Sequence, residues 1–162
     1  MELSTTSSRI EKYTTIELAD SDFYYHDGNI TWTNKEQSVY ITNLMNAIYP
    51  EGSLNFSMYE RENDSDIYFI DGQSRMASIY EFVNGISRKG KQVAWCDGKK
   101  KVLYEMPNGN LKRGYRVMTD EERDFFDNIT VCVNIYSFVN NPRVVRKRAR
   151  EVEDNSCTSH KK

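Results

Sequence analysis

Cysteine and histidine are scarce in this 162-residue chain, which has three Cys and two His. Cys96, Cys132 and Cys157 are odd in number and widely spaced, so they form neither a disulfide framework nor the Cys-x-x-Cys pairs of a zinc site. A Ser-His-Asp triad would have to use His26 or His160, and no Gly-x-Ser-x-Gly elbow is present. We therefore expect any chemistry to use carboxylates, Arg, Gln and backbone amides, without zinc, haem or flavin.

Long apolar runs are also missing from the sequence. No window approaches the roughly 18–20 apolar residues of a membrane span. The opening residues, MELSTTSSRIEKY, lack the apolar stretch of a signal peptide. These two observations predict an intracellular protein that has no membrane partner.

Charge is distributed unevenly along the chain, whose formal net charge is −2. Residues 143–162 carry seven Lys or Arg and three Asp or Glu, a net of +4, so the preceding residues carry a net of −6. The sequence Asn-Asn-Pro at 140–142 is a turn-like break between the two parts. We predict a loose N-terminal segment over 1–20, one domain over 21–142 and a flexible basic tail over 143–162.

Hydrophobic periodicity predicts alternating helices and strands within the domain. Apolar positions at helical spacing predict a helix over 35–48 and another that follows Gly72 and ends at Asn84-Gly85. Thr119 with Glu122 three residues later is a capping box that starts a third helix. The predicted strands cover 54–59, 67–70 and 129–139, with a hairpin around the Asp-Gly pair at 97–98. The predicted fold class is α+β.

The segment DIYFIDGQSRMASIYEFVNG, residues 66–85, is the motif that indicates chemistry. A buried strand ends at Ile70, Asp71 and Gly72 form a tight turn, and a helix begins within two residues. Unpaired N–H groups and the helix dipole favour an anion at this place. Arg75 in the first helical turn is unfavourable to the helix itself, so a bound phosphate or a carboxylate partner would explain it better.

The same motif also has a purely structural interpretation. Asp71 or Ser74 would then cap the helix, and Arg75 would pair with Asp71 or Glu81. No Walker-type phosphate loop accompanies the turn, so spacing alone leaves both interpretations open.

The run IDGQSRMASIYEFVNG resembles the signature IDGQQRLTSLYxFLxG of the domain of unknown function number 262. This family forms the N-terminal part of GmrSD-type modified-DNA restriction enzymes and belongs to the ParB/sulfiredoxin-like superfamily. Weaker similarity extends to ITWTNKEQSVYITNLMNAIYPEGSLNFSMY before the motif and RVMTDEERDFFDNITVCVNIY after it, from roughly Asp27 to Val139.

The resemblance implies a compact ParB-like fold with a mixed sheet and a nucleotide site at the DGQSR turn. In the family the motif is associated with NTP binding and hydrolysis, which implies catalytic roles for Asp71, Gln73 and Arg75. Arg75 would clamp phosphate, Gln73 would orient phosphate or water, and Asp71 would hold Mg²⁺ or the nucleophile. Glu36 and Gln37 would form the opposite wall, unless they belong to a solvated helix face. The implied nucleotide-binding set is Asp71, Gly72, Gln73, Ser74, Arg75, Glu36 and Gln37.

Three departures from the family pattern keep the function open. Ser74 replaces the second Gln of the motif, the Arg that usually precedes the Trp is missing before Trp32, and no HNH-type nuclease sequence is present. One function is a nucleotide-binding regulatory domain in a DNA-related process, with Mg²⁺–NTP as ligand and slow NTPase activity. The alternative is an inactive interaction or decoy protein that binds a DNA-processing partner or nucleic acid. Relatives often self-associate, so the resemblance also implies a homodimer.

The basic tail supports nucleic-acid binding. Its cations would contact several phosphates with salt-dependent, sequence-independent affinity, and Lys99, Lys100 and Lys101 beside Trp95 would extend this surface. The candidate tail residues are Arg143, Arg146, Lys147, Arg148 and Arg150. The same cluster is also typical of a solubilising tail or of a nuclear import signal, so the location is cytoplasmic, or nuclear in a eukaryotic host. The negative charge of the preceding residues opposes nucleic-acid binding.

Overall fold

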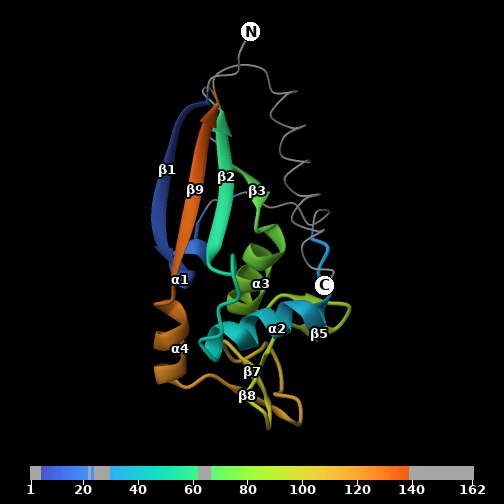
Figure 1. The fold of residues 1–162 in the computed structure, drawn as a ribbon. Helices are drawn as coiled ribbons and strands as arrows, with labels where there is room; N and C mark the ends of the chain where they lie inside the picture. The colour runs from blue at the N-terminus through green and yellow to red at the C-terminus, as the bar shows by residue number, and fades with distance from the viewer. Residues whose placement is uncertain (1–4, 22, 24–29, 62–66, 139–162) are drawn as a thin grey trace.

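The computed structural model describes residues 5–21, 23, 30–61 and 67–138 (Figure 1). Its largest sheet is mixed and four-stranded, in the order β1-β9-β2-β3. The four strands are β1 (Thr5–Thr14), β2 (Asn55–Arg61), β3 (Ile67–Asp71) and β9 (Thr130–Phe138). β9 is antiparallel to β1 and parallel to β2, and β2 is antiparallel to β3. The three predicted strands are therefore confirmed, and they pair within one sheet.

Four helices are described, and three of them begin in the same way. The helices are α1 (Thr15–Ala19), α2 (Asn34–Met45), α3 (Gln73–Asn84) and α4 (Asp120–Asp127). A Thr–Glu capping box starts α1, α2 and α4, which confirms the prediction for Thr119 and Glu122. α2 ends three residues before the predicted boundary at residue 48, because Ala47 has a left-handed backbone with φ of 53°. α3 differs from the others, since its N-cap is Gly72 and no side chain caps it.

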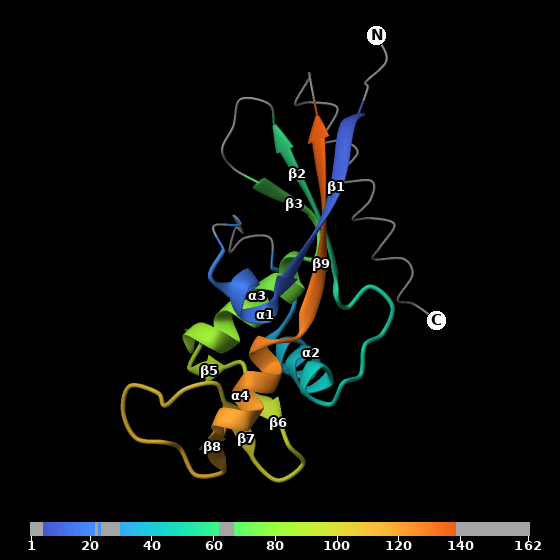
Figure 2. The same ribbon diagram turned by 90° about the vertical axis from the view of Figure 1, so that its left-hand side faces the viewer.

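One face of the four-stranded sheet packs into the hydrophobic core. Alternate residues of β9 and β2 are fully buried there, together with apolar residues of α1 and α3, which lie side by side (Figure 2). Those strand residues are Val131, Val133, Ile135, Phe56 and Met58. Among the described residues, no helix combines the length and the apolar character that a membrane crossing requires. Helices and strands thus form an α+β fold, as the sequence predicts.

Five short strands form two further sheets at the end of the molecule where α2 and α4 lie (Figure 1). β4 (Ser87–Arg88) and β5 (Lys91–Gln92) pair as a small hairpin. β6 (Trp95–Cys96), β7 (Lys101–Leu103) and β8 (Tyr115–Val117) form a three-stranded sheet in which β7 is antiparallel to β6 and parallel to β8. The predicted hairpin around residues 97–98 is confirmed as the β6–β7 pair, with shorter strands than expected.

The predicted loose segment over residues 1–20 is wrong where the structure describes it. β1 pairs with β9 from Thr5 to Thr14, so the backbone ladder supplies the order that the Ser/Thr-rich side chains do not indicate. Arg9 forms an ion pair with Glu60 of β2, and Leu18 of α1 is fully buried. The domain therefore begins before the predicted boundary at residue 21. The predicted tail, residues 143–162, lies outside the described residues.

Arg116 of β8 joins the β6–β7 turn to the start of α4. Its guanidinium donates to Asp97 (Nε to Oδ2, 3.0 Å) and to both carboxylate oxygens of Glu122 (2.8 and 2.7 Å). Asp97 Oδ1 also accepts hydrogen bonds from the backbone N–H groups of Lys99 and Lys100. These N–H groups, Lys100 first, together with Arg116 lower the pKa of Asp97 from 3.8 to about 2.

We expect Asp97→Asn to remove a pH-dependent part of the stability. Because the pKa of Asp97 is lowered on folding, its contribution is complete above about pH 4 and is lost as the pH falls toward about 2. In urea unfolding, the variant should be less stable than wild type at pH 6, and the difference should shrink steadily between pH 4 and pH 2. Glu105→Gln is the control, since Glu105 is exposed and has no ion pair within the described residues. A difference that stays constant with pH would contradict this role of Asp97.

Candidate functional site

The DGQSR turn, residues 71–75, joins β3 to α3 as predicted. Gly72 is buried and has a φ of +104°, and a Cβ at this position would lie 2.6 Å from Cδ1 of Phe56. Phe56 is itself fully buried in β2. Glycine is therefore required here both by the backbone conformation and by the close approach of the aromatic ring.

Arg75 links the first turn of α3 to the four-stranded sheet through two hydrogen bonds. Its NH1 donates to the backbone oxygen of Asn55 (2.7 Å), and its NH2 donates to Oδ2 of Asp71 (3.1 Å). The guanidinium carbon lies 5.1 Å from the ring centroid of Phe56. The Arg75 side chain is 12% exposed, whereas that of Asp71 is 43% exposed. Of the partners that the sequence left open for Arg75, the structure thus shows the Asp71 carboxylate.

Other polar groups of the turn have no side-chain partner within the described residues. No side chain caps α3, so the N–H groups of its first turn have no side-chain acceptor. This rules out Asp71 and Ser74 as caps of the helix. The side chains of Gln73 and Ser74 are half-buried and have no hydrogen-bond partner in the part of the chain that the structure describes. Gln73 and Ser74 thus belong to the first turn of α3, at the positive end of its dipole.

Glu36 and Gln37 do not form the opposite wall of this turn. Gln37 is buried, and its Nε2 donates to Oε2 of Glu81, two turns along α3 from the DGQSR residues. Glu36 is exposed and accepts from the backbone N–H of Thr33 (2.7 Å) in the capping box of α2. Gln37 is therefore a core residue, and Glu36 is occupied at a helix start.

Tyr40 of α2 is a buried residue that is affected by the charge of Arg75. Its hydroxyl donates to the backbone oxygen of Ser53 (2.7 Å). Burial raises the pKa of Tyr40, and the positive charge of Arg75 opposes this rise. Near Arg75, helix α2 thus contributes a buried tyrosine rather than the predicted carboxylate and amide.

A buried ion pair centred on Glu81 was not predicted from the sequence. The Glu81 side chain is fully buried, and its two oxygens accept from Gln37 of α2 and from Nε of Arg88 in β4. The carboxylate therefore joins α2, α3 and the β4–β5 hairpin. One signal was available, because Glu81 lies among the apolar positions Ile79, Phe82 and Val83 of the buried side of α3.

The three residues predicted to be catalytic lie in one turn, as their adjacency in sequence requires, and only Asp71 and Arg75 are in contact. Asp71, Gln73 and Arg75 come from the end of β3 and the first turn of α3. Within the described ranges, no three His, Cys, Asp or Glu side chains gather as a metal site. The predicted nucleic-acid contacts of the tail lie outside the described residues.

Comparison with protein-family models, with curated proteins and with solved structures gives no match. The turn offers an uncapped helix N-terminus, an exposed carboxylate and two uncommitted polar side chains.

Proposed function

We propose that the chain is a nucleotide-binding regulatory domain of ParB-like fold that acts in a DNA-related process. The observation that carries the proposal is the uncapped start of α3, the one described helix without a capping box. Phosphate oxygens are strong acceptors for N–H groups at such a position, and the helix dipole favours their charge. The resemblance of the motif to a nucleotide-associated signature agrees with this chemistry.

The side chains of the turn suit a phosphate ligand with a bound cation. Gly72 has no Cβ, so a phosphate can approach the backbone closely. Gln73 and Ser74 would donate to phosphate oxygens, since neither is engaged within the described residues. Asp71, which is 43% exposed, would contact Mg²⁺ that the phosphates also coordinate, because Mg²⁺ is often held by one carboxylate together with substrate phosphates.

The position of Arg75 favours binding over rapid hydrolysis. To reach a transferring phosphoryl group, Arg75 would have to release Asn55 or Asp71, and those contacts hold α3 against β2. Stabilisation of the transition state depends on charges that are already in place. We therefore propose that turnover is slow, and the same observation supports an inactive interaction protein as the second candidate.

Nucleotide binding should raise the thermal midpoint, and Ser74→Asp should abolish that shift. At a concentration near 100 times Kd, a bound NTP would add about 2.7 kcal/mol to the stability, or roughly 5–10 °C for a chain of this size. Asp at the second position of α3 would repel phosphate while favouring the helix dipole, so the ligand-free variant should be at least as stable as wild type. The measurement is a thermal-shift titration with ATP, GTP, CTP and UTP, with and without Mg²⁺.

Asn110→Asp is the matched control, because it adds one negative charge on an exposed residue away from the turn. Its shift with nucleotide should equal that of wild type. If no nucleotide shifts the wild-type midpoint, the second candidate is favoured. A shift that Ser74→Asp retains would place the ligand elsewhere in the molecule.

A further inference from the structure

The charge of the domain is distributed unevenly along its sequence. Residues 87–117, which run from β4 to β8, contain nine Lys or Arg and two Asp or Glu, a net of +7. The other residues up to Pro142 contain six Lys or Arg and nineteen Asp or Glu, a net of −13. The modest negative charge of the domain as a whole therefore hides a strongly basic part in one region of the fold.

Five of these cations lie in or beside two neighbouring turns, at the end of the three-stranded sheet where β7 and β8 begin. The backbone N–H of Lys101 donates to the oxygen of Gly114 (3.0 Å), and Lys101 is paired with Tyr115 in the β7–β8 register. The lysines before Lys101 and the cations before Gly114 consequently lie next to one another. We call this surface the basic edge, and it consists of Lys99, Lys100, Lys101, Lys112 and Arg113.

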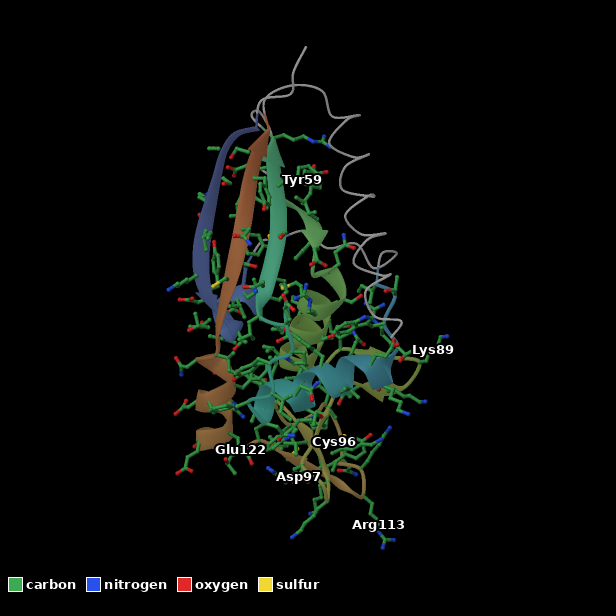
Figure 3. The ribbon with its side chains drawn as sticks, viewed as in Figure 1. Tyr59, Lys89, Cys96, Asp97, Arg113 and Glu122 are labelled. Carbon is green, nitrogen blue, oxygen red and sulfur yellow. The ribbon has the colours of Figure 1, made fainter. Side chains whose placement is uncertain are left out.

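The positive charge of the basic edge is not neutralised by the described residues. All five side chains are exposed, and none forms an ion pair in the described part of the chain. The nearby carboxylates of Asp97 and Glu122 are instead engaged by Arg116. In Figure 3, Arg113 extends outward on one side of this end, and Glu122, which Arg116 binds, lies on the other side.

We propose that the basic edge binds the phosphate backbone of a nucleic acid, independently of the nucleotide site at the DGQSR turn. Cations alone suffice for phosphate contacts, which position a protein without reading sequence. Membrane insertion and protein docking both need exposed apolar or aromatic anchors. None of the large exposed apolar side chains of the described residues lies in the turns 97–101 and 111–114. The acidic residues outside this region, including those of α4 at the same end of the molecule (Figure 1), would repel the nucleic acid and so confine it to the basic edge.

The test compares two double variants of the full chain. Lys100→Gln with Arg113→Gln removes two exposed charges from the basic edge, and the matched control, Lys12→Gln with Lys35→Gln, removes two exposed lysines elsewhere. Binding to a fluorescein-labelled 24-base-pair duplex of mixed sequence is followed by anisotropy between about 50 and 200 mM salt. The slope of log K against log salt should fall in magnitude by about 2 for the edge variant and should not change for the control.

Three outcomes would overturn the proposal. The first is an edge variant with the wild-type slope, which would assign the phosphate contacts to the rest of the chain. The second is equal loss in both double variants, which would show only an effect of net charge. The third is absence of duplex and single-strand binding together with retention on phosphatidylserine vesicles, which would identify the edge as a lipid surface. Unfolding midpoints of both variants should match wild type, since these side chains form no described ion pair.

Discussion

Replacement of Gly72 by alanine should destabilise the protein by about 3 kcal/mol. Two costs combine at this residue. A φ of +104° is unfavourable for any residue with a Cβ, and the added Cβ would lie 2.6 Å from the ring of Phe56. The ring cannot move aside cheaply, because Phe56 is fully buried and also contacts the guanidinium of Arg75. Urea unfolding followed by circular dichroism measures the loss.

Gly98→Ala separates the two costs. Gly98 has a similar φ of +91°, but an added Cβ there would meet no atom within 4 Å. This variant should lose only the conformational part, about 1 kcal/mol. If both variants lose the same amount, Phe56 does not confine the turn, and the close approach of ring and backbone has no energetic consequence.

Replacement of Arg88 by methionine should cost about 2–3 kcal/mol, because it leaves the carboxylate of Glu81 buried without its cation. Glu81 is fully buried and, among the described residues, would keep only the hydrogen bond from Gln37. We expect a loss toward the low end for a broken buried pair, since the Arg88 side chain is 38% exposed and water can partly replace it. The measurement is the free energy of unfolding in urea at neutral pH.

Two further variants show whether the charge is responsible. Lys91→Met lies in the same hairpin and removes an exposed cation that has no ion pair among the described residues, so it should change stability by less than about 0.5 kcal/mol. Glu81→Gln added to Arg88→Met removes the buried charge and should restore most of the loss, because an amide oxygen can still accept from Gln37. If the double variant remains as unstable as Arg88→Met, lost packing rather than unpaired charge explains the effect.

Local sequence signals predicted the elements near the DGQSR turn well. Apolar β-branched residues indicated β3, helical spacing indicated α3, and Gly85 ends that helix in the left-handed conformation. Thr119 and Glu122 specified the start of α4, since a capping box depends only on residues three apart. These predictions succeeded because the interactions that determine them lie within one turn or one strand.

Predictions that depended on distant contacts failed. β1 is polar in sequence, and its order comes from hydrogen bonds to β9, more than a hundred residues away. Gln37 was assigned to the nucleotide site that the family resemblance implies, but Glu81 holds it in the core. The partner of Arg75 was correctly included among the alternatives, since Asp71 lies four residues away, whereas its bond to Asn55 crosses from α3 to β2. Composition over the whole domain also concealed the opposite charges of its two regions.

The order β1-β9-β2-β3 also constrains how the chain acquires its structure. β9 is the last of these strands along the chain, yet it lies between β1 and β2 and supplies the pairing edge of both. During synthesis, the edges of β1 and β2 that pair with β9 therefore stay unpaired until residues 130–138 have left the ribosome. Completion of the sheet is consequently a late, long-range event. Until then, these unpaired edges of β1 and β2 are the part of the nascent chain most open to mispairing.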